Sequence, residues 1–205
     1  MKQFLYLFLL MTVAIVAACT SSEKSTVGSS TEHRVYAAGA MIDSLGVQRA
    51  TLWVNGVATY LCDSSSTATA LFVTDGGDVY VAGGVVEGEN EDMRSWAMLW
   101  KNGHGTRLFA DESLATALWV ADGRVYVTGY RLRDDNPESF LWMSGAIRNA
   151  GEEGALPQSV VARDNEIYIG YNGYTYDGQP VASVWQNDES LYIFPDAQFA
   201  AVQVK

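Results

Sequence analysis

The side chains that could do chemistry are few in this sequence, and they form no recognised catalytic pattern. Only two histidines are present, His33 and His104, so the sequence offers few residues for a catalytic triad or a His-rich metal site. The sequence contains no Walker loop, HExxH, dinucleotide fingerprint or EF-hand spacing. We therefore predict a noncatalytic protein without a cofactor, and an enzyme of unknown reaction is the alternative.

Four carboxylates gather in one short segment: Glu87, Glu89, Glu91 and Asp92. Oxygen ligands at this density could hold Ca²⁺, but the segment lacks the ordered ligand spacing of calcium loops. Exposed acidic loops are more commonly solvated, so our prediction for this segment is no metal site, with these four residues as the candidates.

Aromatic residues outside any repeated motif are the remaining candidates for recognition. Trp96, Tyr130, Tyr171, Tyr174 and Tyr176 lie in or beside segments that we expect to be loops. Exposed Tyr and Trp contribute contact area with little loss of entropy. We predict that Trp96, Tyr130, Tyr174 and Tyr176 belong to a binding face; the alternative is that Tyr174 and Tyr176 only cover a neighbouring loop.

These candidates are set within a motif pair that occurs four times. VYAAG, VYVAG, VYVTG and IYIG contain Tyr36, Tyr80, Tyr126 and Tyr168, which are 44, 46 and 42 residues apart. TLWVNG, MLWKNG, FLWMSG and SVWQND contain Trp53, Trp100, Trp142 and Trp185. Their repetition indicates a structural role for these eight residues, with each Trp filling the same gap between neighbouring units.

Each repeat predicts several short strands. The VYV and IYI segments are β-branched, aromatic and bounded by glycine, which is typical of strands. Asn55-Gly56, Asp75-Gly76, Asn102-Gly103 and Asp122-Gly123 are signals for tight hairpins. An Ala-rich strand, the VYV strand, the LW strand and a short strand such as 58–62 or 106–110 make four antiparallel strands per repeat. This is the blade of a β-propeller.

The propeller domain is expected to span residues 33–205, which at about 43 residues per repeat allows four four-stranded blades. The chain enters at the second strand of the first blade, and 197–204 look like a further copy of a first strand. We predict that Phe199 to Val204 pair with the strand starting at Val35 and close the ring. The alternative is that the chain is part of a larger propeller.

The repeat resembles a family of uncharacterised bacterial exported proteins and lipoproteins in which VYVAG and LWKNG recur every forty-odd residues. The resemblance covers the whole chain after residue 32 and implies a β-propeller, but no activity. The fourth repeat departs from the pattern, because Gly170 comes one residue early and Asn187-Asp188 replace Asn-Gly.

The first 32 residues predict where in the cell the protein is located. Residues 1–18 form a signal peptide, with Lys2 before the apolar run Phe4 to Val16. Val16-Ala17-Ala18-Cys19 resembles the bacterial lipobox, which implies that Cys19 is acylated and becomes the first residue of the mature protein. Two acyl chains anchor a protein stably. Residues 19–32 then read as a flexible Ser/Thr-rich tether, and the resemblance to enteric lipoproteins implies the outer membrane.

The net charge of the chain limits the classes of molecule that it can bind. Thirteen basic and 24 acidic residues give a net charge of -11, which repels nucleic acid. We therefore expect a membrane contact through the N-terminal lipid and a protein or glycan partner. The sequence predicts a lipid-anchored binding module of the cell envelope, and a structural component of an envelope assembly is the second interpretation.

Overall fold

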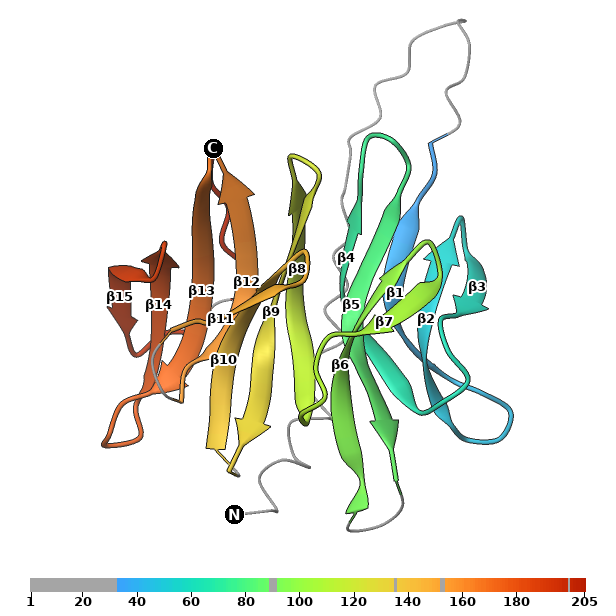
Figure 1. Cartoon of the computed structure of the whole chain (residues 1–205), viewed down its shortest axis with the longest axis horizontal. Coiled ribbons are helices and arrows are strands. Elements are labelled where there is room, and N and C mark those ends of the chain that lie inside the picture. Colours follow the sequence, from blue (N-terminus) through green and yellow to red (C-terminus); the bar gives the residue numbers. More distant parts are fainter. Residues whose placement is uncertain (1–32, 89–91, 135, 152–153, 199) are drawn as a thin grey trace, which may run out of the picture.

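The computed structural model of the protein describes residues 33–88, 92–134, 136–151, 154–198 and 200–205. Fifteen strands within these ranges form four antiparallel sheets, and each sheet is built from strands that are consecutive in the sequence (Figure 1). The all-β prediction is confirmed, and the arrangement of the sheets is propeller-like.

The sheets, named A to D in chain order, have the following strands. Sheet A contains β1 (Tyr36–Ile42), β2 (Gln48–Val54) and β3 (Val57–Tyr60). Sheet B contains β4 (Ser66–Val73), β5 (Val79–Glu87), β6 (Arg94–Lys101) and β7 (His104–Arg107). Sheet C contains β8 (Ser113–Ala121), β9 (Arg124–Arg133), β10 (Asn136–Met143) and β11 (Ala146–Asn149). Sheet D contains β12 (Leu156–Arg163), β13 (Glu166–Tyr174), β14 (Pro180–Gln186) and β15 (Glu189–Pro195).

Hairpin turns follow the Asn-Gly signals. Asn102 and Gly103 have φ values of 51° and 84°, and Asn55-Gly56 and Asp122-Gly123 are positive at both positions as well. Positive φ at both central residues is the type I′ requirement. The prediction for Asp75-Gly76 is wrong, because in that turn only Gly77 has a positive φ. The amide of Gly77 donates to the carbonyl of Thr74, so the turn is longer.

The first strands of sheets B, C and D share a β-bulge. The register shifts between Ala68 and Ala70, between Ala115 and Ala117, and between Pro157 and Ser159. A Cβ added at Gly129, opposite the second bulge, would lie 2.0 Å from the carbonyl oxygen of Leu114. A Cβ at Gly83 would meet the carbonyl oxygen of Thr67 at the same distance, so this close approach explains the glycines that end VYVAG and VYVTG.

The bulges also connect one sheet to the next. The hydroxyl of Thr69 donates to the carbonyl of Ala115 at 2.8 Å, and that of Thr116 donates to the carbonyl of Pro157 at 2.6 Å. Each bulged Thr in this way links the first strand of its sheet to the first strand of the following sheet. The series β4, β8, β12 forms the inner row of the molecule.

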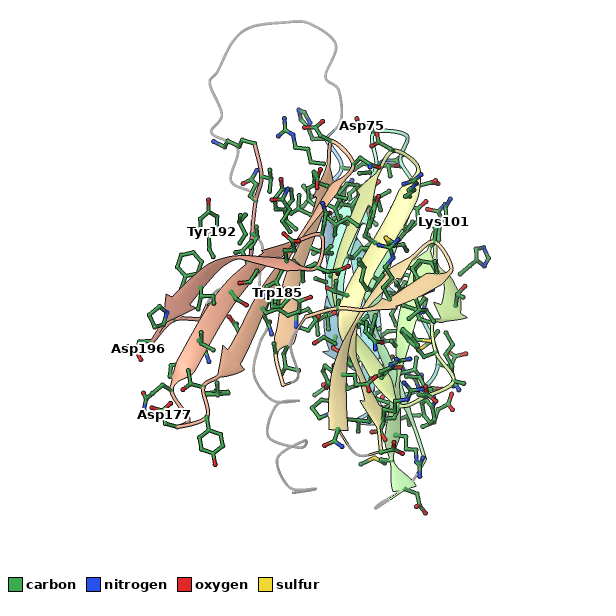
Figure 2. The ribbon with its side chains drawn as sticks, turned by 60° about the vertical axis from the view of Figure 1, so that its left-hand side comes forward. Asp75, Lys101, Asp177, Trp185, Tyr192 and Asp196 are labelled. Atoms are coloured by element: carbon green, nitrogen blue, oxygen red, sulfur yellow. The ribbon has the colours of Figure 1, made fainter. Side chains whose placement is uncertain are left out.

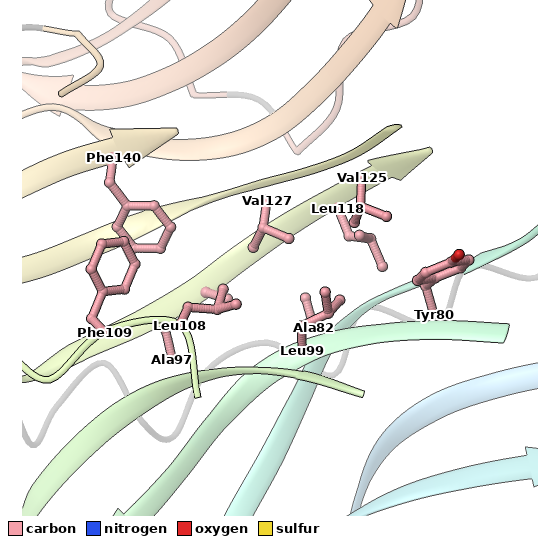
Figure 3. Close-up of a cluster of buried hydrophobic side chains, with 11 residues drawn as sticks. Tyr80, Ala82, Ala97, Leu99, Leu108, Phe109, Leu118, Val125, Val127 and Phe140 are labelled. Carbon is pink, nitrogen blue, oxygen red and sulfur yellow. The ribbon is translucent and has the colours of Figure 1, made fainter. Parts of the chain in front are cut away.

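Buried clusters lie between consecutive sheets. Trp100 of sheet B packs with Ala50 and Leu52 of sheet A, and Trp142 of sheet C joins the cluster that contains Tyr80 and Leu99 of sheet B. Figure 3 shows this second cluster, in which Leu99 and Tyr80 face Val127 and Val125. Trp185 of sheet D packs likewise with Tyr126 and Leu141 of sheet C. The repeated Trp therefore comes from the later sheet of each pair, and in the pairs B–C and C–D the repeated Tyr comes from the earlier sheet.

The four sheets form an open row, with sheets A and D at opposite ends (Figure 1). Sheet A has three strands, and β1 pairs with β2 alone among the pairings of described residues. Sequence analysis predicts that 199–204 complete this sheet, but the described part of that segment contacts β12. The amide of Val202 donates to Oγ of Ser159 at 3.0 Å. The segment continues the inner row at the far end from β1, so the ring closure predicted for one chain is not formed in this structure.

Candidate functional site

The loops that join second to third strands lie at one end of the molecule, together with the segments that join successive sheets (Figure 1). We call this end the loop end. It contains the predicted binding segments 40–49, 84–95, 130–138 and 171–180 as far as they are described. Antiparallel meanders with the same order of strands place these loops on the same side.

Ion pairs hold three of these loops. Arg49 contacts Asp43 at 2.6 Å in sheet A, Arg107 contacts Glu87 at 2.7 Å in sheet B, and Arg131 contacts Glu138 at 3.1 Å in sheet C. Asp43 also accepts hydrogen bonds from the backbone amides of Val47 and Leu45. The Val47 amide and the Arg49 guanidinium lower the pKa of Asp43, because both stabilise the carboxylate.

Two of the predicted binding aromatics are not freely presented. Trp96 is half-buried, and the guanidinium of Arg107 lies 4.4 Å from its ring centroid. Tyr130 is also half-buried, and burial, followed by the charge of Glu112, raises the pKa of its hydroxyl. Tyr171 is 1% exposed and belongs to the cluster between sheets C and D. The expectation of one face of exposed aromatics therefore needs correction at these residues.

Sheet D presents the remaining two aromatics. Tyr174, the last residue of β13, is 62% exposed, and Tyr176, in the loop between β13 and β14, is fully exposed. The hydroxyl of Thr175 donates to Asp177 at 2.6 Å, and the amide of Gln179 donates back to that hydroxyl at 3.0 Å. The Thr175 hydroxyl lowers the pKa of Asp177. This small network gives the loop a defined shape, and the side-chain amide of Gln198 donates to the Tyr174 hydroxyl at 3.4 Å.

The acidic segment is described only at its ends, Glu87 and Asp92, since Glu89 and Glu91 lie outside the described residues. Glu87 accepts a hydrogen bond from Arg107. Among the described residues, no three His, Cys, Asp or Glu side chains gather as a metal would require.

A cleft between sheets C and D was not predicted from the sequence. It has a volume of about 350 Å³, with Tyr126, Tyr171 and Trp185 on its aromatic side. Arg124, Arg148, Glu166 and Asp188 supply charges of both signs around it. These residues come from different repeats and from opposite sheets, so only their pairing in space brings them together.

The exposed apolar surface of the fourth strand of sheet D was also missed. Leu191, Tyr192, Ile193 and Phe194 of β15 are all more than two-fifths exposed. Figure 2 shows Tyr192 on the side of sheet D turned away from sheet C, and Trp185 on the side turned toward it. The run LYIFP, longer and more apolar than the fourth strands of the other repeats, is the signal that could have indicated this surface.

Cys19, the signal peptide and the tether lie outside the described residues. In the part of the chain that the structure describes, no helix has the length and hydropathy to cross a membrane. Comparison with known proteins gives no matching family model, no matching curated protein and no matching solved structure.

Proposed function

We propose that this protein is a lipid-anchored, noncatalytic binding module of the cell envelope that presents its loop end to a protein or glycan partner. The observation that carries the proposal is the exposure of Tyr174 and Tyr176 on a loop shaped by Thr175 and Asp177. Aromatic side chains on an ordered loop offer apolar contact area and a hydroxyl with few rotatable bonds to fix on binding.

The other three loops of the loop end contribute polar surroundings. In each of them a carboxylate is already paired with an arginine, so these groups are positioned before a partner arrives. A partner would meet an aromatic tip on sheet D beside a rim of neutralised charges, which is the common layout of recognition surfaces.

The test compares capture of partners from an envelope extract by three immobilised proteins: the wild type, a Tyr174→Ser/Tyr176→Ser variant, and a control. The control, Val57→Ser/Ile147→Ser, changes two exposed apolar residues that lie at the end of the molecule opposite the loop end. We expect a specific component to be captured by the wild type and the control and lost with the tyrosine variant. Equal capture by all three would remove the tyrosine loop from the proposal.

The lipid anchor is tested separately. We expect a fatty-acid label to enter the wild type and not a Cys19→Ser variant, because Cys19 alone follows an apolar run and small residues. Label retained in Cys19→Ser would refute the anchor while leaving the binding proposal open to its own test.

A structural component of an envelope assembly is the second candidate. The apolar residues of β15 favour it. Tyr192 and Ile193 are consecutive in this edge strand, lie on its two opposite faces, and are 58% and 64% exposed. Large exposed apolar patches mark interaction sites. In this role the closed propeller would form between chains, since the C-terminal segment lies against β12 of its own chain.

A further inference from the structure

The interface between sheets B and C and the interface between sheets C and D are made from the same two halves. The earlier sheet supplies the face with the repeated Tyr, as Tyr80 and Tyr126 show, and the later sheet supplies the face with the repeated Trp. Among the described residues, no sheet follows the face of sheet D that contains Tyr168, and no sheet precedes the face of sheet A that contains Trp53.

Side chains on the two end faces are more exposed than the equivalent side chains at the interfaces between sheets. Tyr80 and Tyr126 are 7% and 6% exposed, whereas Tyr168 is half-buried. Val81 and Val127 are buried at the Trp faces of sheets B and C, whereas Ala37, at the same repeat position of sheet A, is exposed. The two end faces are therefore the matching halves of one more interface of the type that the chain already forms twice.

The C-terminal segment matches the strand that sheet A lacks. Sheets B, C and D each begin with an inner strand, whereas sheet A begins with β1. Val202 and Val204 are half-buried and alternate with the exposed Ala201, Gln203 and Lys205, which is the pattern of a strand with one covered side. Arg163 of β12 donates to the carbonyl of Val204 at 3.2 Å. The segment thus lies beside β12, as β12 lies beside β8.

The open arrangement of the four sheets determines which β1 strand the C-terminal segment can reach. Sheets A and D lie at opposite ends, so the segment is far from β1 of its own chain (Figure 1). Bringing the two ends together within one chain would require the three clusters between the sheets to repack, and packed cores resist such deformation.

We infer that two copies of this chain join head to tail. The C-terminal segment of each copy stays against its own β12 and adds as the inner strand to β1 of the other copy, and the Tyr face of sheet D packs on the partner copy's Trp face. Both contacts form twice, so the ring closes with no free end. It contains two sets of four sheets, a blade number within the range of about four to eight seen in propellers.

The experiment is cysteine cross-linking between copies of the full chain in detergent, in a Cys62→Ser background. One copy carries Ala201→Cys and an affinity tag, and the other carries Ala40→Cys on β1; both alanines are exposed. Asp111→Cys, an exposed position between sheets B and C, replaces Ala40→Cys in the matched control. Copies with only Cys62→Ser report any reaction through Cys19, and circular dichroism confirms that each variant is folded.

We expect a bis-maleimide reagent to join the Ala201→Cys and Ala40→Cys copies at least about tenfold more efficiently than the control pair, since a formed contact raises the effective concentration of the two thiols. Sedimentation of the wild type should give the mass of two copies. Yields equal to the control, or a monomeric wild type, would overturn the inference. A product that forms only when both cysteines are in one chain, and that has the mass of one chain, would overturn it in favour of closure by the chain's own segment.

Discussion

Single residues show how the repeats diverged while their interfaces stayed filled. Between sheets B and C, Phe109 and Phe140 pack with their ring centroids 4.4 Å apart, opposite Gly129. Between sheets C and D, the place of Phe109 is taken by Gly151, and a Cβ there would lie 2.7 Å from the ring of Tyr171. One aromatic from the later sheet thus replaces an aromatic from the earlier one, which preserves packing.

The cost of losing one repeated Trp is the first prediction. Trp100 is 1% exposed and its indole nitrogen has no hydrogen-bond partner among the described residues. We expect Trp100→Ala to lower the free energy of unfolding by about 3–5 kcal/mol, because it opens a cavity between sheets A and B. Trp100→Phe should cost less, since it removes an unsatisfied polar group and keeps most of the ring.

Chemical denaturation measures both changes. Leu45→Ala, at a residue that is largely exposed, is the control and should change the free energy of unfolding by no more than about 0.5 kcal/mol. A Trp100→Ala variant as stable as the control would mean that this cluster does not hold sheets A and B together.

The second prediction concerns the titration of Asp43. Its pKa lies below the ordinary value of 3.8, through the Val47 amide and Arg49. Since the pKa is lower in the folded state, the stabilising contribution of Asp43 is fully present above the unfolded-state value and disappears as the pH falls through the folded-state pKa. Carboxyl ¹³C NMR should show Asp43 titrating below pH 3.8, and Arg49→Gln should move its pKa upward.

Asp177 provides an internal reference for that titration. Its pKa is lowered by the Thr175 hydroxyl on a different sheet, and Arg49 does not contact it. We therefore expect Arg49→Gln to leave the Asp177 pKa unchanged. A shift of both groups, or of neither, would contradict the role assigned to the Asp43–Arg49 pair.

At the scale of the element, the sequence predicted the type of a hairpin turn wherever both central residues are of types that favour positive φ. The Asn-Gly pairs at 55–56 and 102–103 predicted their turns correctly. Asp75-Gly76 failed because a second glycine follows it, and Gly77 takes the positive φ instead. The β-bulges were not predictable, since they depend on the approach of one strand's carbonyl to the glycine of its neighbour.

The fourth repeat gives the third prediction. Its turn has Asn187 and Asp188 at φ values of 49° and 72°, a conformation that costs an aspartate more than a glycine. We expect Asp188→Gly to raise the free energy of unfolding by about 0.5–1 kcal/mol, despite the greater freedom of glycine in the unfolded chain. The converse change, Gly103→Asp, should lower it by a similar amount. Thermal denaturation of both variants gives the answer, and changes of the same sign would contradict the turn argument.

At the scale of the whole molecule, repeat spacing predicted four units of antiparallel strands, and the four sheets follow that spacing. The sequence could not predict which aromatics are exposed. Trp96 and Tyr176 look alike beside loops, yet an arginine from a neighbouring strand covers one and not the other. Nor could it predict an open row, because the angle between packed sheets depends on side-chain volumes across each interface.

The last prediction tests whether the C-terminal segment belongs to the inner row of its own chain. Val161, at the position of Phe72 and Trp119 in the earlier inner strands, is buried on the side of β12 that faces away from sheet C. Val202 and Val204 are half-buried beside this strand. Val202→Asp/Val204→Asp would place two carboxylates against apolar surface, whereas Ala201→Asp/Gln203→Asp adds the same charge on the exposed side of the same segment.

We expect the first double variant to lower the melting temperature by several degrees, since placing a carboxylate against apolar surface costs about 1 kcal/mol or more. The second should stay within about two degrees of the wild type, as surface substitutions do. Differential scanning calorimetry at two protein concentrations separates the two contacts, because only a contact between copies makes the melting temperature depend on concentration. Equal melting temperatures for the two variants would show that the segment does not pack on β12, because only the alternation of covered and exposed side chains distinguishes them.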